Sequence, residues 1–345
     1  MAAAARFVLA CCGSIEWSAG HVVEVSFDTV RFVARDGVSL TGTWFTPDCG
    51  AAPLRTVIVV AGGGGIPARS YRHFASHLAR HGAAVLTFDY RGIGQSRQGP
   101  LRKLNAGIEH WGVLDLGAAL AFARAAFPDL PLAAVAHSIG TMLIGAAPDA
   151  GQISRLVFFG PHTGYYGDYR MRWRVPLFLT WHVLMPVLTR IVGYFPGRAL
   201  GLGEDLPSRF ALDWSGRRRA AFITTAKHRL RFEQILAGYA RVRAKTLVLS
   251  ISDDALAPPK AAQRVLSAYP NIHALQEIVT PTTLGCTRLG HLAFLRRSTT
   301  GYLWNKALAW LLPTDSNGGA DPTPSLRDAR HRLRQEGTLA RSSTQ

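Results

Sequence analysis

The hydrophobic pattern of this chain alternates between short, continuously apolar runs and longer segments with helical spacing. Thr56–Ala61 and Ala84–Phe88 are almost wholly apolar, which is typical of strands buried on both faces of a parallel sheet. Before them, Val22–Val33 and Val38–Phe45 flank a turn at 35–37, and their spacing indicates a β-hairpin. The other predicted strands are Leu132–Val135, Arg155–Phe159, Thr246–Ile251 and Ala274–Val279.

Segments with helical spacing stand between and after these strands. The predicted helices are Arg69–His81, Trp111–Ala126, Thr141–Ala147, Pro258–Tyr269 and Thr300–Leu312. Strands and helices that alternate with short connections predict a parallel sheet covered by helices on both faces, which is an α/β fold. The length of 345 residues fits one large domain with insertions better than two equal domains.

The alternation stops after Gly160 and resumes at Thr246. We predict that the intervening segment, rich in Tyr, Trp, Arg and Pro, forms a cap over the carboxyl edge of the sheet. Within it, Val175–Thr189 carries no charge over 15 residues, whereas a membrane-spanning helix needs about 17–25. This run also contains Pro176 and Pro186, so it favours a buried or lid helix over a span. An apolar lid would also suit a greasy substrate or a weak contact with a membrane surface.

These patterns divide the chain into five parts. We expect an unstructured leader at 1–20, a core in two parts at 21–162 and 241–312, a cap at 163–240, and a disordered tail at 313–345. A faint lipoprotein-like cleavage pattern ends at Cys11, but the apolar run before it is too short for a signal peptide. The four cysteines show neither disulfide nor metal-ligand spacing, which is typical of a reducing compartment and predicts a cytoplasmic location without metal or organic cofactor.

The net charge of +17 raises the question of a nucleic-acid partner. Only five of the 39 basic residues are lysines, and the arginines are spread along the chain without clustering in one arm. The chain also contains no nucleic-acid-binding motif, so we predict no such partner. The charge could still attract anionic substrates or membrane surfaces.

The segment 136–140, Ala-His-Ser-Ile-Gly, is the strongest chemical signal in the chain. Small residues lie two positions before and two positions after Ser138, where a larger side chain would collide with a sharply turned backbone. An apolar run precedes the segment and a helix-compatible run follows it. The pattern therefore predicts a strand-to-helix turn that raises the Ser138 hydroxyl to the edge of the sheet.

A serine needs a base to accept its proton and an acid to orient that base. In a sheet of this kind such groups gather at the carboxyl ends of the strands. The strand 246–251 ends at Asp253 and Asp254, and we favour Asp254 because its spacing to Pro258 turns the loop directly into a helix. Asp253 is its rival, and a helix cap is the alternative role for Asp254. His291 lies in the loop after the last strand, which predicts a triad in the order Ser138, Asp254, His291.

Acyl transfer also needs N–H donors for the oxyanion, each of which lowers the barrier by about 2.7–4 kcal/mol. We predict the N–H of Ile139, directly after the serine, as one donor. The glycines after Ala61 offer the second, for which we favour Gly63 over Gly62 and Gly64. No Gly-Lys-Ser/Thr follows these glycines, so they are not a phosphate-binding loop.

With these residues in view, the chain resembles the α/β-hydrolase superfamily, and more narrowly its bacterial serine aminopeptidase S33-like, or Hydrolase_4-type, members. The resemblance extends from Val30 to Leu312 and is most specific in the loop Phe88–Ser96. It implies a mostly parallel sheet of eight strands, a helical cap after the sixth strand and a Ser/Asp/His hydrolase. The other segments that carry it are 136–140, 253–254, 290–291, 203–207 and Trp214.

The sequence departs from the family pattern at three places, none of which removes a reacting group. Ala136 replaces the usual first glycine, Thr141 stands where many relatives have a second glycine, and Ala61 replaces a common histidine. We therefore predict a serine hydrolase that cleaves an ester, or else an amide or thioester, of a hydrophobic small molecule. An acyltransferase with the same triad and a catalytically idle binding protein are the alternatives. His162 follows a strand end and is a candidate substrate contact, whereas the histidines other than His162 and His291 are interpreted as surface or core residues.

Overall fold

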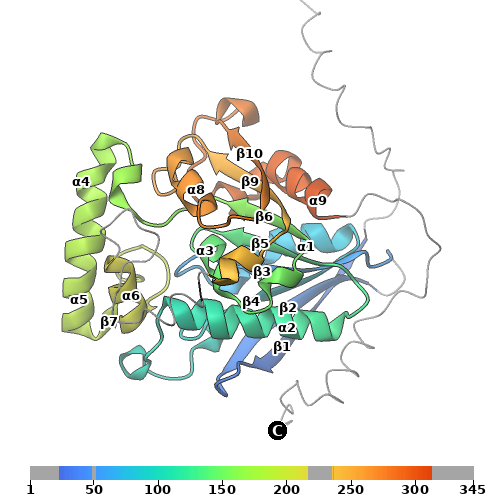
Figure 1. The fold of residues 1–345 in the computed structure, drawn as a ribbon, viewed down its shortest axis with the longest axis horizontal. Helices are drawn as coiled ribbons and strands as arrows, with labels where there is room; N and C mark the ends of the chain where they lie inside the picture. The colour runs from blue at the N-terminus through green and yellow to red at the C-terminus, as the bar shows by residue number, and fades with distance from the viewer. Residues whose placement is uncertain (1–22, 49–51, 217–234, 236, 313–345) are drawn as a thin grey trace, which may run out of the picture.

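The computed structural model describes residues 23–48, 52–216, 235 and 237–312. The predicted leader at 1–20 and tail at 313–345 lie outside the described residues. A central sheet of eight strands is covered by helices on both faces (Figure 1). The predicted α/β architecture is confirmed.

The strands of this sheet follow the order β1-β2-β4-β3-β5-β6-β9-β10. β1 pairs antiparallel with β2, β2 pairs antiparallel with β4, and all other neighbours are parallel. The carboxyl ends of the parallel strands therefore meet at one edge. The strands are β1 Val25–Val33, β2 Ser39–Pro47, β3 Thr56–Ala61, β4 Ala83–Phe88, β5 Leu132–His137, β6 Arg155–Phe159, β9 Lys245–Ile251 and β10 His273–Val279.

Two hydrophobic cores lie on opposite faces of the sheet, and alternate residues of each strand enter opposite cores. Val57 and Val59 of β3 belong to one core, and Ile58 and Val60 belong to the other. Every residue of β3, β4 and β5 is buried, which explains their continuously apolar sequences.

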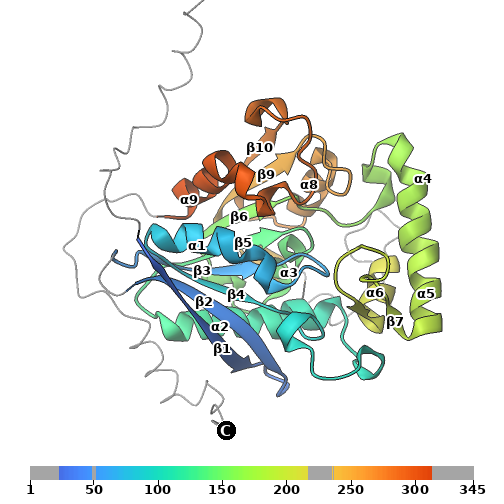
Figure 2. The same cartoon turned by 180° about the vertical axis from the view of Figure 1, so that it is seen from behind.

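The helices divide between these two faces (Figures 1 and 2). The first core contains residues of α2 (Gly117–Ala126), α3 (Gly140–Ala146) and α8 (Pro259–Leu266). The second contains residues of α1 (Arg72–Arg80) and α9 (Asn305–Leu311). The helix predicted over 111–126 begins with a π-helical turn at His110–Leu116, a detail that apolar spacing does not reveal.

The segment between β6 and β9 adds no strand to the main sheet in its described residues. It contains α4 (Met171–Leu179), a π-helical turn (Thr180–Leu184), α5 (Met185–Val192) and α6 (Ser208–Ser215). Two short strands, β7 (Tyr194–Phe195) and β8 (Leu206–Pro207), pair with each other. Figure 1 shows these elements to the left of the sheet.

α4, the π-helical turn and α5 form one helix from Met171 to Val192, longer than the uncharged run on which we based our prediction. By length and composition alone, this helix is sufficient to cross a membrane. No residue of α4 is buried, so this half is not the buried helix that the sequence allowed. Pro176 lies inside α4 and Pro186 at the start of α5, directly after the π-helical turn.

Candidate active site at the carboxyl edge of the sheet

The turn between β5 and α3 holds Ser138 in a strained conformation. Ser138 has φ of 57°, and it is the one non-glycine residue with positive φ in the described part of the chain. Such strain costs on the order of 1–3 kcal/mol and is typical of functional sites. A Cβ at Gly140 would collide with the carbonyl oxygen of Ala61, so only glycine lets α3 approach β3 this closely.

Asp254, which follows β9, and His291, in the loop after β10, form a pair in which the carboxylate is buried and the imidazole is half-buried. Nδ1 of His291 donates to Oδ2 of Asp254 at 2.7 Å. Oδ1 of Asp254 accepts the N–H groups of Leu256 and Ala257 at 2.8 and 2.9 Å. Burial raises the pKa of the Asp254 carboxyl, but the charge and hydrogen bond of His291 and these two amides outweigh burial and leave the pKa below its ordinary value. Asp254 is therefore a carboxylate that keeps the proton on Nδ1 and leaves Nε2 of His291 as the basic nitrogen.

Asp253, the rival acid in the sequence, performs a different task. Its Oδ2 and Oδ1 accept the N–H groups of Leu289 and Gly290, both at 2.9 Å. These residues directly precede His291, so Asp253 fixes the loop that carries the histidine. The two neighbouring carboxylates therefore hold different parts of one loop: Asp253 holds the backbone directly before His291, and Asp254 holds the His291 ring.

The His291 ring lies against the residues that surround Ser138. It stacks on the ring of His137, the residue before Ser138, with 5.0 Å between ring centroids. A Cβ at Gly160, which follows β6, would lie 3.2 Å from His291 and 3.3 Å from Asp254. The structure describes no hydrogen bond between Oγ of Ser138 and the His291 ring, and such bonds are often long before substrate binds.

The predicted oxyanion donors differ in how they are placed. The N–H of Ile139 lies at the start of α3, where helical N–H groups lack intrahelical acceptors, and it has no acceptor among the described residues. The N–H of Gly63, in contrast, donates to the hydroxyl of Tyr71 at 2.7 Å, which argues against our prediction of Gly63 as the second donor. Gly64 lies beside Ile139, since a Cβ at Gly64 would be 3.6 Å from Cγ2 of Ile139.

We next compared the sequence of this chain with models of known protein families. A family model described as "Serine aminopeptidase, S33" (Hydrolase_4) matches residues 52–278. The chain belongs to this family. It is an α/β-hydrolase of the serine-hydrolase type, as the resemblance in its sequence implied. No curated protein matches the chain.

Solved structures with the same fold include several esterases and a lipase. A soluble variant of monoglyceride lipase from Saccharomyces cerevisiae is 16% identical, with a TM-score of 0.58, and the alignment covers 87% of this chain and 99% of the lipase. An esterase from Pyrococcus furiosus is 14% identical, with a TM-score of 0.52 and coverages of 83% and 90%. An esterase from Exiguobacterium antarcticum is 14% identical, with a TM-score of 0.51 and coverages of 82% and 99%. At these identities the likeness shows the fold.

A chain of hydrogen bonds beneath the site of this hydrolase was not anticipated from its sequence. Nε2–H of His137 donates to the carbonyl oxygen of His291 at 3.3 Å. Burial, together with the charge of His291, holds the pKa of His137 well below its ordinary value, so the ring is neutral. Nδ1 of His137 must then accept, and the Tyr71 hydroxyl donates to it at 3.0 Å while accepting from Gly63. Tyr71 thus links the glycine loop, the serine turn and the histidine loop.

Replacement of Tyr71 by phenylalanine should lower the free energy of unfolding by about 1–3 kcal/mol, because the Gly63 N–H and His137 Nδ1 lose their partner in the core. Urea denaturation measures the change. Tyr90→Phe is a matched control, since Tyr90 is equally buried but its hydroxyl has no partner among the described residues. If Tyr71→Phe were no more destabilising than Tyr90→Phe, this network would be unimportant. A higher kcat in Tyr71→Phe would mean that the Gly63 N–H, once it is free of the Tyr71 hydroxyl, acts as an oxyanion donor.

Aromatic residues of the segment between β6 and β9 extend the hydrolase site away from the sheet. The buried ring of His162 stands edge-on to His291, with centroids 5.3 Å apart. Trp214 of α6 contacts His162, and Trp181 contacts Trp214, at centroid distances of 5.6 and 5.7 Å. Phe210 of α6 lies beside Gly64. The sequence offered His162 as a substrate contact and Trp214 as part of the family resemblance, but it gave no signal for Trp181.

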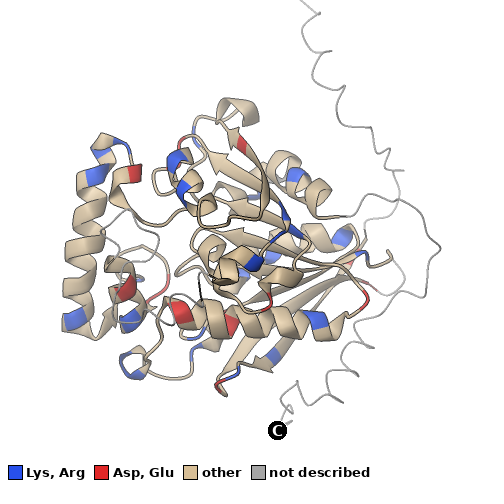
Figure 3. Ribbon diagram, in the orientation of Figure 1, with Lys and Arg blue, Asp and Glu red and all other residues tan. Residues whose placement is uncertain are grey.

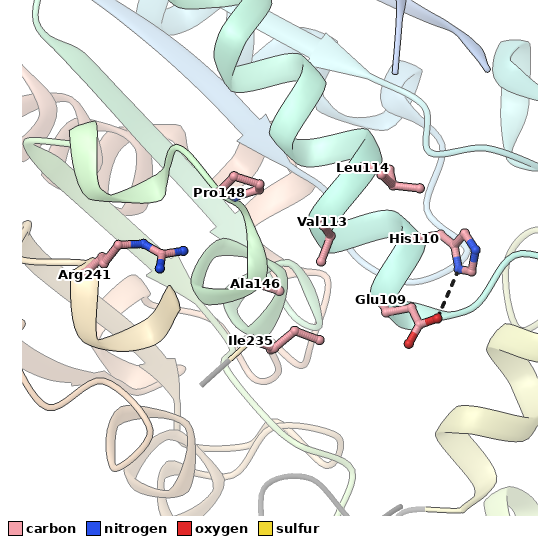
Figure 4. Close-up of a pocket in the computed structure, with 8 residues that line it drawn as sticks. All are labelled: Glu109, His110, Val113, Leu114, Ala146, Pro148, Ile235 and Arg241. Carbon is pink, nitrogen blue, oxygen red and sulfur yellow. Dashed lines mark ion pairs between the residues drawn. The ribbon is translucent and has the colours of Figure 1, made fainter. Parts of the chain in front are cut away.

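A cavity of about 310 Å³ lies elsewhere in this hydrolase, between the π-helical turn His110–Leu116 and the end of α3 (Figure 4). Oε1 of Glu109 lies 3.8 Å from Nδ1 of His110, and both residues line the cavity. None of its lining residues is a predicted site residue, so the cavity does not belong to the serine site. Within the described ranges, no group of three or more His, Cys, Asp or Glu residues is suited to hold a metal ion.

Proposed function

We propose that the protein hydrolyses carboxylic esters of hydrophobic small molecules, with Ser138 as nucleophile, His291 as base and Asp254 as the acid that orients it. The observation that carries the proposal is the Asp254–His291 pair, which lies beside the strained Ser138 turn at the carboxyl edge of the sheet. Backbone strain at Ser138 is costly, and it is explained if the hydroxyl must point toward a substrate.

The reaction follows from these positions. Nε2 of His291 accepts the Ser138 proton as Oγ forms a bond to the acyl carbon, and the negative charge moves to the carbonyl oxygen. The N–H of Ile139 and, we propose, that of Gly64 stabilise this oxyanion. As the ester C–O bond breaks, the imidazolium returns its proton to the leaving alcohol. Water then attacks the acyl-enzyme with His291 again as base, which releases the acid and regenerates Ser138.

The substrate class follows from the aromatic residues of the 163–240 segment, which we propose acts as a cap. Trp214 places an apolar ring against His162, whose ring contacts His291, and Phe210 places another beside Gly64. An acyl chain or an apolar alcohol would be buried between these rings. Among proteins with the same fold, the yeast monoglyceride lipase and the esterases are named for ester substrates. This agreement supports an ester rather than a peptide as the substrate.

A series of p-nitrophenyl esters of increasing acyl length tests the proposal. We expect kcat/KM to rise from the acetate to medium-chain esters, by about threefold or more per buried CH₂. Trp214→Ala should flatten this dependence, whereas Trp310→Ala, a change of the same kind in α9, should leave it unchanged. Absence of turnover across the series would contradict an esterase. Product analysis with added alcohols distinguishes hydrolysis from acyl transfer.

A further inference from the structure

A row of apolar side chains faces outward along the whole length of the α4–α5 helix. Its members recur at every fourth position, and each has 46–75% of its surface exposed. Together they form the longest line of exposed large apolar side chains in the described chain. They are Met171, Val175, Leu179, Val183, Val187 and Ile191, which we call the α4–α5 row.

The π-helical turn keeps this row on one side of the helix. In a regular α-helix, residues four apart are offset by about 40°, so a row of six would wind around the axis. The π-helical turn at Thr180–Leu184 rotates the chain by a smaller angle per residue, so it reverses part of this offset in the middle of the row. The buried residues Trp181, Met185 and Thr189 lie on the other side, toward the body of the protein. From the π-helical turn onward the helix is therefore anchored along one face and exposed along the other, whereas α4 has no buried residue.

The charged residues of the α4–α5 helix and its start are all positive. Between Asp168 and Glu204 the chain contains five arginines and no acidic residue. Arg170, Arg172 and Arg174 lie at the start of the helix and Arg190 at its end, and none of them forms an ion pair with a described acid. Asp168 pairs with Arg264, and Glu204 with Arg69 and Arg198. Figure 3 shows basic residues at both ends of the helix and uncharged residues between them.

We propose that the α4–α5 row docks this protein on the surface of an anionic phospholipid bilayer. The helix would lie in the plane of the interface, with the row among the acyl chains and the flanking arginines at the lipid phosphates. Because the helix packs on the body of the protein from Trp181 onward, it would lie on the bilayer and not span it. The docked surface is next to the segment that carries Trp181 and Trp214, so a lipid-soluble substrate would reach the site from the membrane.

A second copy of the chain fits this face less well than a bilayer. A two-fold axis through the row would bring like ends or opposite ends of two helices together. Both ends carry arginines, so either arrangement places positive charges against positive charges. An anionic membrane satisfies the apolar row and the arginines together.

Sedimentation of the full chain with lipid vesicles tests the proposal. We expect the protein to bind vesicles of phosphatidylcholine mixed with phosphatidylglycerol, and to bind vesicles of phosphatidylcholine alone much more weakly. Val175→Gln with Leu179→Gln should weaken binding to the mixed vesicles by about tenfold or more, since glutamine keeps the helix but removes apolar surface. Arg170→Gln with Arg172→Gln should reduce the preference for the anionic vesicles.

Leu275→Gln with Ile278→Gln provides the matched control. These residues of β10 are 56% and 55% exposed, close to the values for Val175 and Leu179, but they lie outside the row. The control should bind like the wild type, with circular dichroism confirming the fold of each variant.

The proposal fails if the wild type does not bind the mixed vesicles or if the control loses as much binding. It also fails if the protein is a dimer without lipid that Val175→Gln with Leu179→Gln converts to a monomer, because a second copy would then cover the row. Binding needs no turnover, so these outcomes are independent of the proposed esterase activity.

Discussion

Replacement of Ser138 by alanine should reduce kcat for a p-nitrophenyl ester by about 10,000-fold or more, because no other group in the site can form the acyl-enzyme. The change removes one oxygen atom and leaves the Ile139 N–H and the Asp254–His291 pair in place. Residual turnover should match the hydrolysis that the oxyanion donors alone support. Initial rates at saturating substrate measure the effect, and His291→Ala should cause a loss of similar size.

Ser138→Gly separates the catalytic role from a structural one. Glycine adopts a φ of 57° without strain, so this variant should unfold with a free energy about 1 kcal/mol higher than that of the wild type. It should be as inactive as Ser138→Ala. A variant that is more stable and inactive shows that the strain at this position serves the reaction. If Ser138→Gly retained activity, the hydroxyl would not be the nucleophile.

Asp254→Asn should reduce kcat by about 10,000-fold, whereas Asp253→Asn should reduce it by no more than about 100-fold. In Asp254→Asn the amide oxygen remains with the N–H groups of Leu256 and Ala257, so the amide nitrogen faces Nδ1 of His291. The ring then carries its proton on Nε2 and cannot accept one from Ser138. Steady-state kinetics on the same ester compare the two variants.

Asp253→Asn is the matched control because the two aspartates are neighbours and serve the same histidine. Its amide can still accept one of the N–H groups of Leu289 and Gly290, so the loop shifts but the tautomer of His291 is preserved. An equal loss in both variants would mean that loop position, and not the tautomer, limits the rate. A larger loss in Asp253→Asn would exchange their roles.

The sequence predicts the core of this fold well because its strands are buried on both faces. The predicted strands Thr56–Ala61 and Arg155–Phe159 match the observed strands at both ends. Continuously apolar runs of this length are shielded from water on both faces only inside the sheet. The turn at Ser138 was also predictable, because its steric demand is visible as small residues at fixed spacing. Helix ends were less accurate, and the π-helical turns at His110–Leu116 and Thr180–Leu184 leave no mark in apolar spacing.

The parts of the site that the sequence does not reveal depend on contacts between distant segments. The direction of the Gly63 N–H is set by Tyr71, which enters from the start of α1 and has no motif of its own. The choice between Asp253 and Asp254 depends on how the loop before His291 folds back on β9. The helix of 171–192 continues past Arg174 and Arg190, which flank the uncharged run 175–189, because a charged residue at a helix end can remain in water.

Reaction with a fluorophosphonate, followed by peptide mapping, tests the central claim most directly. Such a reagent forms a covalent adduct only with a serine whose proton is removed by a correctly placed base. We predict one adduct per chain, on the peptide that contains Ser138, and its absence from both Ser138→Ala and Asp254→Asn. An adduct on another residue, or labelling that persists at full strength in Ser138→Ala, would contradict the assignment of Ser138 as the nucleophile.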